Sequence, residues 1–122
     1  MLEASKKRET NYPDAPIEVQ DSTFSQVTEK YPLMVIDCWA SWCGPCRAMA
    51  PIVDVLAKDY AGMVVFGKLN VDENPETPAR FGIMGIPTLL ILRDGLEVDR
   101  IVGLVPKHSI EARLRRYLSH EI

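Results

Sequence analysis

Three short, almost continuous apolar runs constrain the fold of this chain more than any other feature. They occupy residues 33–40, 64–69 and 88–93. Apolar runs of this length, rich in β-branched residues, are typical of strands that are covered on both faces, and none approaches the ~20 residues of a membrane-spanning helix. Apolar residues at helical spacing lie between these runs, most clearly over residues 45–60. The sequence therefore predicts an α/β domain built around a buried sheet.

The predicted elements alternate in type along the chain. Helices are expected at 24–31, 45–60, 76–81 and from 106 onward, and strands at 17–20, 33–40, 63–71, 88–93 and 97–102. Strands joined through helices are expected to be parallel with right-handed crossovers, whereas the turn Asp94-Gly95 predicts an antiparallel hairpin for the last two strands. The predicted result is a mixed sheet of about five strands with helices on both faces.

The composition excludes several classes of protein. The chain has 122 residues, of which 47% are hydrophobic and 25% are charged, as expected for one globular domain. A net charge of −3 provides no electrostatic case for binding nucleic acid or an anionic membrane. We interpret the polar residues 1–15 as a flexible extension before a domain of residues 16–122. The basic cluster at residues 6–8 is not followed by an apolar segment, so we expect a cytoplasmic protein.

A C-x-x-C pair, Cys43 and Cys46, lies where the strand at 33–40 meets the helix at 45–60. Sites in open α/β sheets form beyond the carboxyl ends of the strands. Two cysteines three residues apart at a helix start lie on one face, so their sulfurs can reach each other. The free amides and the dipole of a helix start stabilise a thiolate, so we expect the outer cysteine, Cys43, to have a lowered pKa. Gly44 keeps the approach open, and Pro45 suits the first helical turn.

Half of a zinc site is an alternative interpretation of this pair. A structural zinc site needs four ligands, usually with a second pair at close spacing. The remaining candidates, Cys38, His108 and His120, are singly placed, so we expect no metal site. Cys38 points to the opposite face of its strand from the neighbouring Asp37 and is expected to be a small core residue.

Asp37 is a single carboxylate in a strand that is otherwise apolar. An unpaired buried charge is costly, so this group should hold a proton or find a cation. Lys68, within the next apolar strand, is the evident cation. A half-hydrated aspartate at a strand end is the alternative.

Residues 39–46, W-A-S-W-C-G-P-C, resemble the active site of the thioredoxin family. Further matches follow in order: Asp37, Pro51 inside the helix, Lys68, V-D-E-N at 71–74, F-G-I-M-G-I-P-T at 81–88, Asp94-Gly95 and Val102-Gly103. The resemblance covers about residues 17–120, and W-C-G-P-C with the downstream G-I-P-T is its most specific part. Three positions depart from the family pattern: Arg47 stands where lysine is usual, Cys38 where an aromatic residue is frequent, and Met84 where arginine is frequent.

The resemblance implies a thioredoxin fold and a protein-disulfide reductase that carries electrons without a bound cofactor. It implies that Cys43 forms a mixed disulfide with the substrate, that Cys46 resolves it, and that a thioredoxin reductase restores the dithiol. Asp37 and Lys68 would support proton transfer at Cys46. A disulfide oxidase or isomerase, and a non-catalytic binding module that uses the same surface, remain the alternatives.

The resemblance also implies a substrate surface around the cysteines. Its expected members are Trp42, Gly44, Pro45, Gly85, Ile86, Pro87 and Gly103, with Trp39 and Pro51 as structural support. Pro87 is expected to be cis and to face the cysteines, which leaves the Ile86 backbone to bond an extended substrate segment by strand addition. The expected partners are disulfide-containing proteins and thioredoxin reductase, and the chain is expected to be a monomer.

Overall fold

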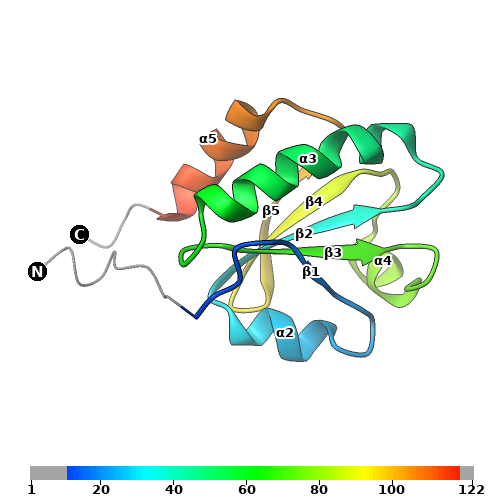
Figure 1. The fold of residues 1–122 in the computed structure, drawn as a ribbon. Coiled ribbons are helices and arrows are strands. Elements are labelled where there is room, and N and C mark those ends of the chain that lie inside the picture. Colours follow the sequence, from blue (N-terminus) through cyan, green and yellow to red (C-terminus); the bar gives the residue numbers. More distant parts are fainter. Residues whose placement is uncertain (1–10, 119–122) are drawn as a thin grey trace, which may run out of the picture.

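A computed structural model describes residues 11–118 of the chain (Figure 1). The elements in this range are β1 (Ile17–Glu18), α2 (Phe24–Lys30), β2 (Leu33–Trp39), α3 (Gly44–Asp59), β3 (Val65–Asn70), α4 (Glu76–Phe81), β4 (Thr88–Arg93), β5 (Leu96–Val102) and α5 (Lys107–Leu118). The basic cluster at 6–8 and His120 lie outside the described residues. Within residues 11–118, no helix combines the length and the apolar character that crossing a membrane requires.

The five strands form one mixed sheet in the order β1-β3-β2-β4-β5. Strand β3 runs parallel to both β1 and β2, whereas β4 is antiparallel to β2 and to β5. Helices α3 and α5 cover one face and α2 the other (Figure 1). The expected mixed sheet with helices on both faces is therefore confirmed, with β2 at its centre.

The expectation that strands joined through helices are parallel is wrong for β4. The six residues of α4 advance the chain by only about 9 Å, whereas the six-residue β3 spans about 20 Å. Helix α4 is thus too short to carry the chain back along the sheet. Strand β4 begins beside the carboxyl end of β2, with Thr88 opposite Cys38, and runs back until Arg93 is opposite Leu33.

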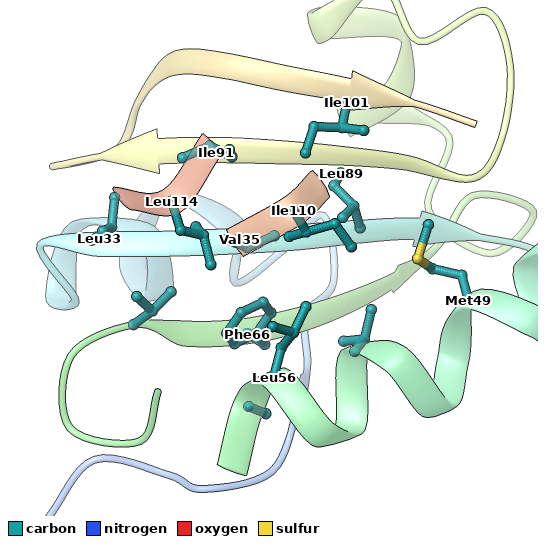
Figure 2. Close-up of a cluster of buried hydrophobic side chains, with 13 residues drawn as sticks. Leu33, Val35, Met49, Leu56, Phe66, Leu89, Ile91, Ile101, Ile110 and Leu114 are labelled. Atoms are coloured by element: carbon teal, nitrogen blue, oxygen red, sulfur yellow. The ribbon is translucent and has the colours of Figure 1, made fainter. Parts of the chain in front are cut away.

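Strand β2 supplies residues to two separate cores because successive side chains point to opposite faces of a sheet. Leu33 and Val35 pack with residues of α3 and α5, as Figure 2 shows. Met34, Ile36 and Cys38 pack on the other face, in the cluster that includes Phe24 of α2. This alternation places the side chain of Asp37 on the face that α3 covers.

The segment expected to be an extension contributes one aromatic contact to the domain. The ring of Tyr12 meets the ring of Tyr31 edge-on, with centroids 5.2 Å apart, and packs against the core on the α2 face. Side-chain contacts with the domain therefore begin before the expected start at residue 16.

Gly67 of β3 is closely surrounded by side chains that leave little room for a Cβ. A Cβ at this position would lie 2.7 Å from Val19 Cγ2 and 3.0 Å from both Ile36 Cδ1 and Met34 Cε. Gly67→Ala is therefore expected to lower the free energy of unfolding by about 1–3 kcal/mol, the usual range for overpacking a core. Denaturant midpoints measure this change. A Cβ at Gly85 would meet nothing within 4 Å, so Gly85→Ala is the control, and equal midpoints for the two variants would contradict the packing described.

Candidate active site

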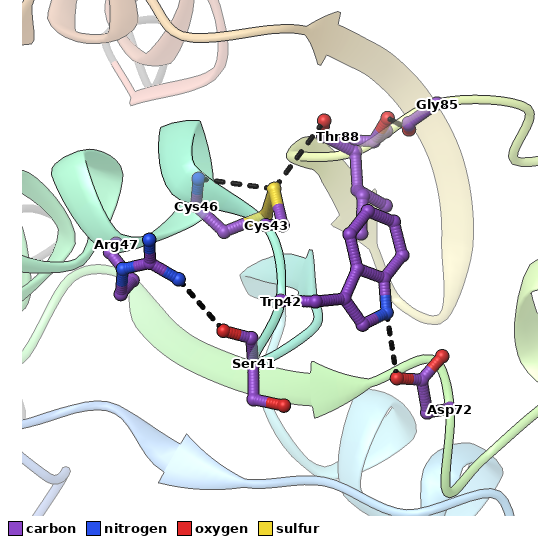
Figure 3. The surroundings of a disulfide bond; sticks show 9 residues. Ser41, Trp42, Cys43, Cys46, Arg47, Asp72, Gly85 and Thr88 are labelled. Atoms are coloured by element: carbon purple, nitrogen blue, oxygen red, sulfur yellow. Dashed lines mark hydrogen bonds between the residues drawn. A yellow bond between two sulfur atoms is a disulfide. The ribbon is translucent and has the colours of Figure 1, made fainter.

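The C-x-x-C pair lies at the carboxyl end of the central strand, as predicted. Cys43 is the N-cap of α3 and is joined to Cys46 by a disulfide, with 5.2 Å between their Cα atoms. The backbone N–H of Cys46 donates to Cys43 Sγ at 3.2 Å (Figure 3). Pro45, in the first turn, has no N–H to leave unpaired. A helix-start amide aimed at Cys43 Sγ favours the thiolate of this cysteine once the disulfide is reduced.

The loop that leads into β4 faces this disulfide. The Ile86–Pro87 peptide bond is cis, which confirms the expectation, and the carbonyl oxygen of Ile86 lies 3.8 Å from Cys43 Sγ. The hydroxyl of Thr88 donates to the carbonyl of Gly85 at 2.6 Å, and Gly103 N–H donates to the carbonyl of Pro87 at 2.8 Å. The cis-proline loop therefore meets the helix start at the sulfurs, and Gly103 is bonded to that loop.

Trp42 stands beside the disulfide with 66% of its surface exposed. Its indole N–H donates to Asp72 Oδ2 at 2.9 Å (Figure 3). The indole borders a groove of about 290 Å³ that is also lined by Val71, Pro78, Ile83, Met84, Gly85 and Ile86. The sequence pattern matches Asp72 only as part of V-D-E-N and does not reveal this bond, because the two partners are 30 residues apart.

Asp37 is buried, with only 1% of its surface exposed, so the half-hydrated alternative is wrong. Among the described residues, neither of its carboxyl oxygens has a hydrogen-bond partner. Burial raises the pKa of Asp37 to about 6, the nearby Lys68 cation opposes this shift, and the Asp54 carboxylate adds to it. Lys68 is directly opposite Asp37 in the β2–β3 pairing, and its Nζ lies 5.1 Å from the centroid of the Trp39 ring.

The other expected site residues occupy varied positions. Gly44 and Pro45 are exposed at the start of α3, and Trp39 packs against the cluster formed by Ala40 and the two cysteines. Pro51 lies inside α3, after Cys46, and its side chain is exposed.

Cys38 is a free, fully buried thiol on the α2 face of the sheet. Burial raises the pKa of Cys38 to about 12, with a smaller contribution from the Asp37 carboxylate. His108 is exposed on α5. Across residues 11–118, no three His, Cys, Asp or Glu side chains are grouped so that they could hold a metal ion.

A disulfide that closes over the first turn of a helix, opposite a cis-proline loop, is a centre for thiol–disulfide exchange, and the relatives of the chain are of this class. The Thioredoxin family model matches residues 15–116. Thioredoxin of Alicyclobacillus acidocaldarius is 45% identical over 100 residues, which cover 82% of this chain and 95% of the relative. Thioredoxin 1 of Nostoc sp. strain PCC 7120 is 45% identical over 105 residues, covering 85% and 98%.

A solved structure, that of a mutant thioredoxin from Halobacterium salinarum NRC-1, superimposes with a TM-score of 0.84 at 32% identity, covering 91% of this chain and 97% of the other. The chain belongs to the thioredoxin family. It is a thiol-disulfide oxidoreductase that reduces protein disulfides, and neither the oxidase or isomerase alternative nor the binding module is favoured. Membership implies disulfide-containing substrates and a thioredoxin reductase as partners.

Proposed function

We propose that Cys43 is the attacking cysteine and Cys46 the resolving cysteine of this protein-disulfide reductase. The observation that carries this assignment is the position of Cys43 Sγ, which accepts the Cys46 N–H at the helix start and lies beside the Ile86 carbonyl. Of the two sulfurs, the one at the N-cap receives the stabilisation that a thiolate needs.

The reaction passes two electrons from the dithiol to the substrate. The Cys43 thiolate attacks one sulfur of the substrate disulfide, the substrate S–S bond breaks, and the other substrate sulfur leaves and takes up a proton. Cys46 then loses its proton and attacks Cys43 Sγ. The mixed disulfide breaks, the second substrate thiol is released, and the Cys43–Cys46 bond forms.

Asp37 is proposed as the group that accepts the proton of Cys46. The nearby Lys68 cation favours the charged form of this carboxyl group. The side chain of Asp37 lies on the face of the sheet that α3 covers, because Ile36 and Cys38 on either side of it point to the opposite face. A pKa of about 6 means that the carboxyl group can exchange a proton near neutral pH, which suits a general base.

The substrate surface is proposed to consist of the side chains and backbone around the disulfide, which are exposed or partly exposed except for the buried Pro87. Its members are Trp42, Gly44, Pro45, Gly85, Ile86, Pro87 and Gly103. The apolar groove beside Trp42 supports this proposal because it is lined by Ile86, whose carbonyl oxygen lies 3.8 Å from Cys43 Sγ. An extended substrate segment would bond the Ile86 main chain as an added strand.

We also propose that the protein acts in the cytoplasm, as a monomer, with residues 16–122 as the catalytic domain after an extension of residues 1–15. The buried free thiol of Cys38 supports the cytoplasmic assignment, because compartments that form disulfides favour paired cysteines.

Cys46→Ser tests the order of the two cysteines. The variant keeps the Cys43 nucleophile but lacks the resolving thiol, so it is expected to accumulate mixed disulfides with its substrates. Gel electrophoresis without and with a reductant detects these adducts, and mass spectrometry locates the bond. Adducts that form equally on Cys43→Ser would contradict the assignment of the nucleophile.

A further inference from the structure

Arg47 is placed unusually for a residue in the first turns of a helix. Cations are disfavoured at a helix N-terminus, and this one lies one residue after Cys46. Its side chain is exposed, yet it does not extend into solvent: Nη1 donates to the carbonyl oxygen of Ser41 at 2.8 Å (Figure 3). This bond spans the loop between β2 and α3 and holds the guanidinium beside the disulfide.

Most N–H donors of the Arg47 guanidinium have no acceptor among the described residues. A guanidinium carries five N–H donors, and in the described part of the chain Arg47 uses its side chain in the bond to Ser41 alone. Arg100 and Arg113, by contrast, are ion-paired with Glu97 and Asp99. No ion pair of Arg47 with a carboxylate occurs within residues 11–118. Arg47 is therefore a fixed cation that lacks an anionic partner within this range.

The position of this cation brings it within reach of a bound substrate. Nη2 of Arg47 lies 3.8 Å from the place that a Cβ of Gly44 would occupy, and Gly44 is the residue after Cys43. A substrate in mixed disulfide with Cys43 is tethered at that sulfur. Because a chain advances by at most about 3.6 Å per residue, the residues next to the substrate cysteine stay close to this guanidinium.

Charge is distributed unequally around the disulfide. In Figure 3 the Arg47 side chain and the Trp42 indole extend to opposite sides of the loop that carries Cys43. On the Trp42 side the fixed charge is the carboxylate of Asp72, and the groove there is lined by uncharged side chains, including Met84, which is 96% exposed. A substrate meets a cation on one side of its cysteine and an anion on the other.

We propose that Arg47 is a specificity-determining residue whose guanidinium binds a side-chain carboxylate of the substrate, one or two residues from the cysteine that joins Cys43. The proposal rests on the proposed function, since it requires the mixed disulfide on Cys43. A planar fork held in advance by Ser41 loses little freedom when it engages a carboxylate, and it can do so with two parallel hydrogen bonds. The partners selected in this way are proteins whose reducible disulfide lies in an acidic segment.

The test uses two disulfide-containing peptides that are identical except for the residues flanking one cysteine, which are Glu in one peptide and Gln in the other. The quantity measured is the second-order rate constant with which the reduced full-length protein reduces each peptide. The ratio of the Glu rate constant to the Gln rate constant is then compared between protein variants, so the intrinsic reactivity of each peptide cancels.

The ratio for the wild-type protein is expected to be about three to five times that of Arg47→Gln, the upper range for a solvent-exposed ion pair. Arg47→Lys keeps the charge but loses the fork, so an intermediate ratio is expected. Raising the ionic strength from about 0.01 M to about 1 M should reduce the wild-type ratio toward that of Arg47→Gln. Lys58→Gln is the matched control, since it removes one exposed cation from the last turn of the same helix and should leave the ratio unchanged.

Two results would overturn the proposal. One is an equal ratio in wild type and Arg47→Gln, and the other is an equal fall in Lys58→Gln, which would indicate a general effect of net charge. Reduction of the Gln peptide by the wild-type protein keeps this test separate from the proposed function. If the Gln peptide is reduced but the ratio is the same in wild type and Arg47→Gln, only the proposed role of Arg47 is contradicted. If neither peptide is reduced, the proposed function is contradicted as well.

Discussion

Cys43→Ser is expected to lower the second-order rate constant for protein-disulfide reduction by roughly 10³-fold or more, since loss of a nucleophile removes the reaction path itself. The hydroxyl of serine does not ionise near neutral pH, so the helix-start amide of Cys46 has no thiolate to stabilise. The fold should be retained, because the side chain that changes lies at the N-cap of α3, where serine is a favoured residue. An assay that follows the thiols released from a substrate protein measures the change, with circular dichroism as the check on folding.

Cys38→Ala is the matched control for this loss. Cys38 is the remaining cysteine of the chain, and burial raises the pKa of its thiol to about 12, so it stays protonated near neutral pH and cannot replace Cys43. Its removal leaves a small cavity on the α2 face and should lower stability modestly without changing the rate constant. A strong loss of activity in Cys38→Ala with an intact fold, or full activity in Cys43→Ser, would contradict the assignment.

Asp37→Asn is expected to raise the free energy of unfolding at pH 8 by up to about 3 kcal/mol, while changing it little at pH 4. The pKa of this carboxyl is 3.8 in an exposed setting and about 6 in the fold, where burial disfavours the charged form. Between these two values the folded state binds more protons than the unfolded state, so the stability of the wild-type protein falls as pH rises. The difference between the two pKa values corresponds to about 3 kcal/mol. The wild-type protein has lost this much stability once the pH has risen above 6, whereas the asparagine of the variant does not ionise and loses none.

Denaturant midpoints measured from pH 4 to pH 8 follow this difference. Asp54→Asn is the control: it removes an exposed carboxylate that raises the pKa of Asp37, so it should shift the stability profile slightly while the buried carboxyl group remains. A parallel pH profile for wild type and Asp37→Asn would show that burial does not perturb this carboxyl group.

The same variant is expected to slow one step of the reaction. Near neutral pH, Asp37→Asn removes the proposed acceptor of the Cys46 proton, so resolution of the mixed disulfide should be slower while the first attack by Cys43 changes little. Stopped-flow measurement of the two steps distinguishes them. Unimpaired resolution, or a variant that is markedly less stable, would make Asp37 a structural residue.

The elements around the site could be predicted because each depends on neighbours in sequence. The run from Leu33 to Trp39 is apolar on both of its faces, which is sufficient to indicate a central strand. The hairpin after β4 depends on two adjacent residues, Asp94 and Gly95, which adopt φ values of 52° and 83°. The C-x-x-C pair lies directly after that central strand and at the start of a helix, so its exchange chemistry could be inferred from spacing and local context.

Tertiary structure alone decided which distant groups meet these local features. The six-residue helix α4 is too short to return the chain to the other end of the sheet, so β4 pairs antiparallel with β2 instead of parallel as expected. The bond from Trp42 to Asp72 and the place of Ile86 beside Cys43 each join residues 30 or more apart, whose positions a local pattern does not encode.

The sequence by itself determined the strands, the helix start and the cysteine pair, because backbone propensity and side-chain periodicity act over a few residues. It also indicated that a carboxylate, Asp37, lay in an apolar strand. Only the folded chain decided that this carboxyl group has no hydrogen-bond partner among the described residues, that its pKa rises to about 6, and that Arg47 turns back to Ser41 beside the disulfide. Burial, charge and the direction of a side chain are set by packing between elements, and packing exists only once the elements are assembled.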